Sequence, residues 1–124
     1  MKAIHTKHAP AAIGPYSQAI AAGDFIFLSG QLGIDPETGA LAGNTVSLQA
    51  EQACKNVEAI LKKEDLSMDT VVKTTCFLST MDDFAAFNDV YARHFIGKPA
   101  RSCFAVAGLP KGGLCEIEVI ALRK

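Results

Sequence analysis

The number of predicted strands, set against the number of predicted helices, most constrains what this chain can fold into. Alternating apolar residues bounded by turn signals predict strands at residues 2–6, 17–22, 25–33, 71–79, 101–107 and 114–123. Only residues 46–64 and 82–96 carry helical periodicity. Strand–helix–strand crossovers are almost always right-handed, which would place both helices on the same face of the sheet. The other face then has no cover within the chain.

A strand of this sheet is nevertheless apolar on both sides. Phe25-Ile26-Phe27-Leu28 is a continuous apolar run, which is typical of strands that are buried on both faces. A second copy of the chain is the simplest cover, so we expect an oligomer. The predicted fold class is α+β, with a mixed β-sheet and two helices on one face. A length of 124 residues predicts a single domain, residues 1–124.

The helix predicted at residues 46–64 is amphipathic. Its apolar stripe consists of Ala50, Ala53, Cys54, Val57, Ile60 and Leu61. On the other face, Glu51 precedes Lys55 and Glu58 precedes Lys62 by one helical turn, which predicts two ion pairs. The stripe is expected to pack on the sheet.

Charge and hydropathy exclude several classes of partner. The 12 Lys and Arg residues nearly balance the 13 Asp and Glu residues, and the two signs are interspersed. Nucleic acid is therefore not an expected partner, because no broad basic field is present. No apolar run is long enough to span a membrane, and the N-terminus lacks the apolar core of a signal peptide. We therefore expect a cytoplasmic protein without a membrane partner.

The cysteine pattern does not match a metal site. Cys54, Cys76, Cys103 and Cys115 form no C-x-x-C pair, and the three histidines have no ligand spacing. Each cysteine lies among apolar or small residues, so we expect reduced, buried thiols. The sequence also has no G-x-S-x-G motif, P-loop or dinucleotide fingerprint. A mechanism without nucleotide, metal or covalent nucleophile is expected.

Polar residues interrupt apolar rows in the last strand and in the second helix. Glu116 and Glu118 share a strand face with apolar residues, and the alternatives are a solvent-exposed face or a functional carboxylate. Asn88 lies in an aromatic stripe of the second helix, at helical spacing from Tyr91. Its side chain either makes a helix-packing hydrogen bond or points its polar end into a pocket.

Two further breaks lie in other strands. Ser29-Gly30-Gln31 interrupts the apolar run that begins at Phe25, which indicates either a β-bulge or a close approach by a ligand or another backbone. Arg101 opens the next-to-last strand, two residues before Cys103, so the two side chains share a face. Arg101 is either a surface charge or a fork that binds a carboxylate through two hydrogen bonds.

Five segments together resemble one family. They are Gly14-Pro15-Tyr16-Ser17-Gln18-Ala19, Ser29-Gly30-Gln31, Phe87-Asn88-Asp89-Val90-Tyr91, Pro99-Ala100-Arg101-Ser102-Cys103 and Glu116-Ile117-Glu118-Val119-Ile120-Ala121. In order and spacing they look like the Rid/YjgF family, most like its RidA branch of 2-iminobutanoate/2-iminopropanoate deaminases. The resemblance implies a chorismate-mutase-like fold and a homotrimer whose sheets form a central barrel. It implies clefts between the subunits and no metal or organic cofactor.

The resemblance also implies an activity and a site. Members of the RidA branch hydrolyse 2-imino acids to 2-oxo acids and ammonia, and so protect pyridoxal-phosphate enzymes. Arg101 matches the arginine that binds the substrate carboxylate, Cys103 the position whose backbone contacts the ligand, and Glu116 the acid associated with the reacting water. Four residues match cleft-lining positions: Tyr16, Ser29, Gly30 and Asn88. Two alternatives are open: a ribonuclease or translation inhibitor that acts on single-stranded RNA, and a non-catalytic sensor or chaperone-like binder of small carboxylates.

Overall fold

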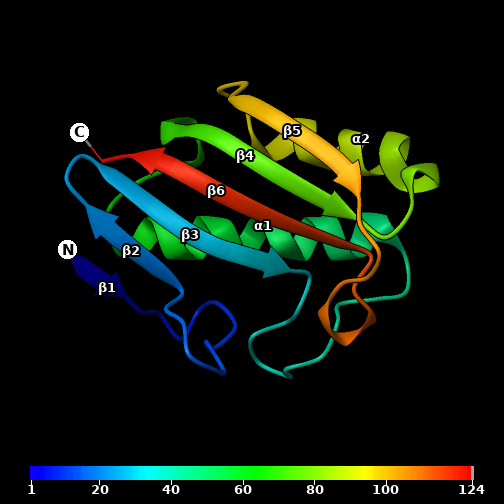
Figure 1. The fold of residues 1–124 in the computed structure, drawn as a ribbon, viewed down its shortest axis with the longest axis horizontal. Coiled ribbons are helices and arrows are strands. Elements are labelled where there is room, and N and C mark those ends of the chain that lie inside the picture. Colours follow the sequence, from blue (N-terminus) through cyan, green and yellow to red (C-terminus); the bar gives the residue numbers. More distant parts are fainter. Residues whose placement is uncertain (124) are drawn as a thin grey trace.

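The computed structural model describes residues 1–123, which form one six-stranded sheet and two helices (Figure 1). The strands are β1 (Lys2–Ile4), β2 (Ala19–Ala22), β3 (Phe25–Leu32), β4 (Val71–Leu78), β5 (Ala100–Ala105) and β6 (Cys115–Leu122). The helices are α1 (Val46–Lys63) and α2 (Phe84–His94), and short 3-10 turns are η1 (Met68–Thr70), η2 (Met81–Asp83) and η3 (Pro110–Gly112). Within these residues, no helix is both long and apolar enough to cross a membrane.

The sheet is mixed, and its strand order is β1-β2-β3-β6-β4-β5. β4 and β5 are parallel, whereas every other neighbouring pair is antiparallel. Both helices lie behind the sheet in Figure 1. The predicted α+β fold, with a mixed sheet and two helices on one face, is therefore confirmed.

The predicted elements are all present, and most are shorter at their ends. The strand predicted at residues 2–6 ends at Ile4, because the Thr6 amide donates to the Gln18 side chain instead of to a neighbouring strand. The helix predicted at residues 82–96 begins only at Phe84. Residues 81–83 form the turn η2, which the Thr80 hydroxyl caps by accepting from the Asp82 amide.

The core lies between α1 and the sheet. The predicted apolar stripe of α1 is confirmed: Ala50, Ala53, Cys54, Val57, Ile60 and Leu61 are fully buried. Ile26 and Leu28 of β3 face this stripe with Ile117 and Val119 of β6, and they are likewise buried. Alternate residues of these strands therefore point to the opposite side, which we call the open face.

The open face carries aromatic side chains that the chain leaves uncovered. Phe25, Phe27 and Phe104 are 41%, 45% and 43% exposed. Phe25 stands against Phe27 with ring centroids 6.4 Å apart, and Phe77 meets Phe104 edge-on at 5.6 Å. The expectation that one sheet face lacks cover within the chain is therefore confirmed.

One buried side chain fixes the segment that joins β1 to β2. The Gln18 amide donates to the carbonyls of Thr6, Ala9 and Pro10 at 3.0, 3.3 and 2.8 Å. Its carbonyl accepts from the Thr6 amide at 2.7 Å. Gln18 is only 2% exposed, so these bonds are shielded from water. They hold residues 6–10 in one conformation.

Candidate functional site

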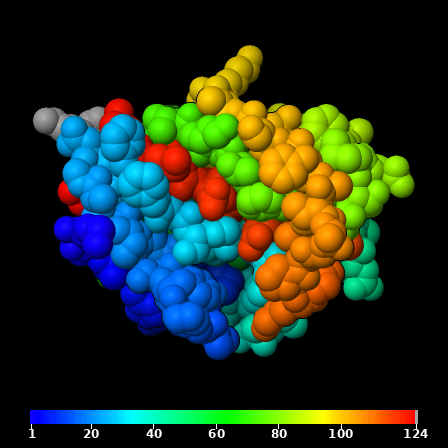
Figure 2. Space-filling view, viewed as in Figure 1, coloured from blue at the N-terminus to red at the C-terminus, as the bar shows by residue number. Residues whose placement is uncertain are grey.

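A cleft of about 680 Å³ opens beside the open face. In Figure 2 it lies between the blue N-terminal segment and the orange loop that contains η3. Its lining includes four of the predicted site residues together with two others: Tyr16, Ser29, Gly30, Glu116, Gln18 and Lys111. The fold therefore brings these four predicted residues together.

Ser29 and Gly30 shape the floor of this cleft. The register between β3 and β6 shifts between Leu28 and Gln31, so the strand bulges there. The Ser29 hydroxyl donates to the Ser17 carbonyl at 2.6 Å. A Cβ atom at Gly30 would lie 2.7 Å from the Glu116 carboxyl carbon. The predicted alternative of a bulge is therefore confirmed, and the missing side chain at Gly30 leaves room for the Glu116 carboxyl group.

Glu116 and Glu118 stand in different surroundings. Glu118 is exposed, whereas Glu116 is partly buried at the cleft. Burial raises the pKa of Glu116 above its usual value, and the nearby Glu118 carboxylate raises it further. A raised pKa makes a carboxylate a stronger base, which favours a role as a general base. Of the two, Glu116 is the candidate for chemistry.

Arg101 lies elsewhere, in a pocket of about 380 Å³ between β5 and α2 that we call the arginine pocket. Its Nη1 donates to the Asn88 side-chain carbonyl at 2.6 Å. Its guanidinium carbon lies 4.7 Å from the centre of the Tyr91 ring and 5.6 Å from that of Phe84. Asn88 thus makes a helix-packing hydrogen bond and also lines a pocket. These contacts fix the plane of the guanidinium.

The charge of Arg101 has no counter-ion within the described residues. No carboxylate of residues 1–123 forms an ion pair with it. A guanidinium that is half-buried, oriented and unneutralised is suited to a carboxylate ligand, because its parallel N–H donors match two carboxylate oxygens.

Cys103 lies beside Arg101 on the helix-facing side of β5, where it pairs in register with Cys76 of β4. Burial raises the pKa of the Cys103 thiol, and the smaller effect of Arg101 lowers it. A raised pKa disfavours the thiolate that nucleophilic catalysis needs. Because β5 is an edge strand of the sheet, one side of its backbone has no neighbouring strand within the described residues.

The other three thiols follow the prediction of buried cysteines. Cys54, Cys76 and Cys115 are fully buried, and burial raises the pKa of Cys76 and Cys115 to about 12. Cys103 differs, since it is only partly buried on the edge strand β5. All four are free thiols.

Within one chain the predicted site residues form two groups, separated by the sheet. Arg101 pairs in register with the buried Thr74, so it faces the helices. Glu116 alternates with the buried Cys115 and Ile117, so it faces the opposite side. The arginine pocket holds Arg101 and Asn88, with Cys103 on the same strand face, and the cleft holds the other four residues.

Sequence reasoning missed three residues at these places. Tyr91 was placed in an aromatic stripe, but its stacking on Arg101 was not predicted. Gln18 lies inside a family segment, and Lys111 lies in the loop before β6. Lys111 adopts a left-handed backbone with φ of 58°, which is uncommon for a residue other than glycine. No pattern in the sequence signals that conformation.

Comparison with known proteins gives full-length matches. The family model described as Endoribonuclease L-PSP matches residues 6–123. The mouse 2-iminobutanoate/2-iminopropanoate deaminase is 47% identical, over 98% of this chain and 91% of its own. RutC family protein PH0854 of Pyrococcus horikoshii is 47% identical, over 98% and 97%. The crystal structure of E. coli TdcF with bound serine has a TM-score of 0.95 at 41% identity and covers 100% of both chains. The E. coli structure shares the fold of this chain, and the three relatives carry different functional names.

Proposed function

Because the chain belongs to the Rid/YjgF family, described by its model as Endoribonuclease L-PSP, we propose that it is an enamine/imine deaminase. It hydrolyses reactive 2-imino acids, such as 2-iminobutanoate and 2-iminopropanoate, to 2-oxo acids and ammonia, and so protects pyridoxal-phosphate enzymes. The name of the mouse relative supports this activity. The observation that carries the proposal is Arg101, an oriented guanidinium without a carboxylate partner in the described chain.

The same proposal includes a homotrimer. The sheet of one chain separates Arg101 from Glu116, so a complete site needs a second chain. The exposed rings of Phe25, Phe27 and Phe104 supply an apolar face that another subunit would bury. In the proposed trimer the sheets face inward as a barrel. Each cleft between subunits then combines the arginine pocket of one chain with the cleft of its neighbour.

The proposed reaction needs only these two groups and water. Arg101 holds the substrate carboxylate, which positions the adjacent imine carbon. Glu116 takes a proton from the attacking water as the new C–O bond forms, and it returns that proton to the imine nitrogen as the C=N double bond becomes single. The carbinolamine then loses ammonia as its C–N bond breaks and the carbonyl forms. Uncatalysed imine hydrolysis is already fast, so one positioned acid–base group is sufficient.

A coupled assay tests the activity directly. A dehydratase acting on threonine generates 2-iminobutanoate, and semicarbazide traps whatever imine survives. The purified chain is expected to lower semicarbazone formation in proportion to its concentration. If an assembled, folded chain leaves semicarbazone formation unchanged, the deaminase proposal is wrong.

A non-catalytic binder of small carboxylates is the second candidate, and the serine bound to the E. coli relative favours it. Serine carries the same α-carboxylate that Arg101 would bind in an imino acid. Binding therefore does not separate the two functions, but turnover does. Titration with serine that gives saturable binding, together with no effect in the semicarbazide assay, would assign the chain to this class.

The substitution Glu116→Gln is expected to change activity and stability in opposite directions. The amide cannot accept the proton of the attacking water, so kcat should fall by roughly 10²- to 10⁴-fold. KM should change little, because Arg101 still binds the carboxylate. Steady-state kinetics in the same assay measure both constants. A change confined to KM would show that Glu116 does not transfer protons.

The stability of this variant should depend on pH. The raised pKa means that the folded state keeps its proton at pH values where the unfolded chain has lost it. The carboxyl therefore costs stability as the pH rises through its folded pKa, and glutamine removes that cost. At pH 7 we expect Tm to rise by about 1–4 °C. Below about pH 4 the difference should vanish, because the carboxyl is then protonated in both states. Thermal unfolding followed by circular dichroism measures this.

A further inference from the structure

A third pocket lies away from both site groups, between the N-terminal segment and the outer side of α1. It has a volume of about 760 Å³, and we call it the basic pocket. Lys55, Lys62 and Lys63 of α1 line it, as do Lys7 and two histidines from residues 5–8. The deaminase proposal assigns no role to any of them.

The charge of the basic pocket is strongly positive, although that of the whole chain is nearly zero. Four lysines line it against one carboxylate, that of Glu58. They are a third of the 12 Lys and Arg residues of the chain. The interspersed charges of the sequence therefore conceal a local concentration of cations.

These lysines lack ion-pair partners within residues 1–123, and two predicted pairs are wrong. Glu51 does not pair with Lys55. Its Oε1 lies 2.9 Å from His94 Nε2 and 3.6 Å from Arg93 Nη2, because α2 brings both side chains onto this face of α1. Glu58 and Lys62 form no ion pair either, since no carboxylate oxygen of Glu58 lies within 4.0 Å of the Lys62 ammonium nitrogen. The ammonium groups are therefore available to an external anion.

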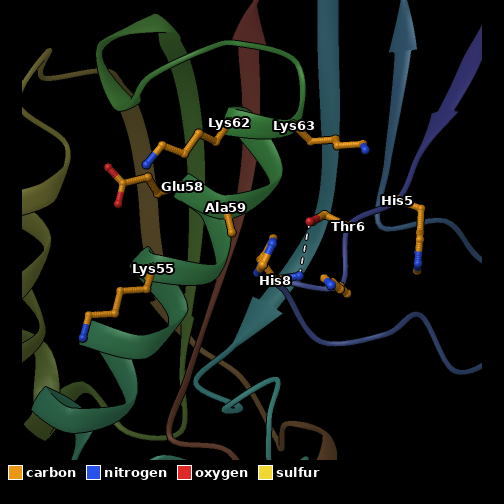
Figure 3. Close-up of a pocket in the computed structure, with 9 residues that line it drawn as sticks. His5, Thr6, His8, Lys55, Glu58, Ala59, Lys62 and Lys63 are labelled. Carbon is orange, nitrogen blue, oxygen red and sulfur yellow. Dashed lines mark hydrogen bonds between the residues drawn. The ribbon is translucent and has the colours of Figure 1, made fainter.

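The basic pocket is shaped by the small side chain of Ala59 and by the N-terminal segment that faces it. Ala59 lies at its centre, and Lys62 and Lys63 extend to opposite sides of it (Figure 3). His8 and Thr6 face Ala59 from the N-terminal segment, where the His8 amide donates to the Thr6 hydroxyl at 3.2 Å. The buried Gln18 holds this segment through its four hydrogen bonds. Such a wall needs little ordering when a ligand binds.

We propose that the basic pocket binds a small anion with two or more phosphate groups. Lysine ammonium groups bind phosphate oxygens through charge-assisted hydrogen bonds, and the imidazoles of His5 and His8 add N–H donors. The volume lies within the range of small-molecule sites. No Phe, Tyr or Trp is among the lining residues of the described chain, so the pocket offers no aromatic platform for stacked bases. A compact phosphate compound therefore fits it better than RNA.

Titration calorimetry with inorganic pyrophosphate, at low and then at raised salt, tests the proposal on the full chain. The variant Lys62→Gln/Lys63→Gln removes two of the four cations. We expect saturable binding by the unmodified chain and a loss of about tenfold or more in affinity in the variant. The control Lys2→Gln/Arg123→Gln removes the same charge outside the pocket and should change affinity less than about twofold. Thermal unfolding of both variants confirms that they fold.

Each further outcome decides the question. Absence of saturable heat with pyrophosphate, or equal losses in the variant and in its control, would overturn the proposal. Binding of a single-stranded RNA oligonucleotide that depends on Lys62 and Lys63, without pyrophosphate binding, would overturn it in favour of nucleic acid. Sedimentation with vesicles that contain a phosphoinositide distinguishes the source of the anion. Sedimentation that depends on Lys62 and Lys63 would identify the ligand's phosphates as those of lipid headgroups. If pyrophosphate binds but the chain does not sediment with the vesicles, the ligand is a free phosphate compound. Either result supports a pocket that binds phosphate groups.

Discussion

Replacing Arg101 by alanine is expected to abolish protection against 2-iminobutanoate in the semicarbazide assay, with kcat/KM at least about 100-fold lower. Alanine removes the guanidinium group that Asn88 and Tyr91 orient in the arginine pocket. The substrate carboxylate would then have no paired donors, and the imine carbon would lose its position relative to Glu116. The proposed trimer should still assemble, because the exposed aromatic rings of the open face are unchanged.

Arg101→Lys is the matched variant, since it keeps the charge. An ammonium group cannot make two parallel hydrogen bonds or stack flat on the Tyr91 ring, so activity should stay at least about tenfold below that of the unmodified chain. Size-exclusion chromatography checks that both variants assemble. Near-normal turnover of Arg101→Ala at low substrate concentration would contradict the proposed carboxylate binding.

Mixing two inactive variants is expected to restore activity. In the proposed trimer, Arg101 and Glu116 of one cleft come from different chains. When Arg101→Ala and Glu116→Gln chains are unfolded together and refolded, about a quarter of the clefts should receive both native residues. Activity should therefore rise from near zero in each variant to about a quarter of the native value.

The controls for this experiment are each variant refolded alone and a chain that carries both substitutions. Mixed refolding of the double variant with Arg101→Ala should restore nothing, because no chain then supplies Arg101. If the two single variants also fail to complement each other while forming mixed oligomers, both residues of a cleft come from the same chain. That result would contradict the proposal that Arg101 of one chain and Glu116 of its neighbour form one site.

Patterns of apolar residues were sufficient to predict the architecture. The stripe of α1 and the alternation of β6 follow directly from burial, and both agree with the structure. The predicted ends of the strands and helices were less accurate, because hydrogen bonds to side chains such as Gln18 and Thr80 change the backbone conformation there. Such interactions join residues that no short sequence window contains.

The sequence singles out candidate site residues, but it does not predict how they are arranged. Arg101, Asn88 and Glu116 each break an apolar pattern, and this made them visible in the sequence. Their separation by the sheet depends on the register between β4 and β5, and the sequence does not state that register. The ion pairs expected on α1 failed for a similar reason, since α2 supplies Glu51 with partners that helical spacing cannot reveal.

Because the four thiols are unequally buried, one cysteine of this chain can be labelled selectively. At alkaline pH a maleimide dye should react with Cys103 first in the native protein, because Cys103 is only partly buried whereas Cys54, Cys76 and Cys115 are fully buried in the core. Because Cys103 lies two residues from Arg101, a dye there would report on the surroundings of the guanidinium without any engineered cysteine. The remaining thiols would react only when the core unfolds, so the rate of their labelling would measure the rate of unfolding.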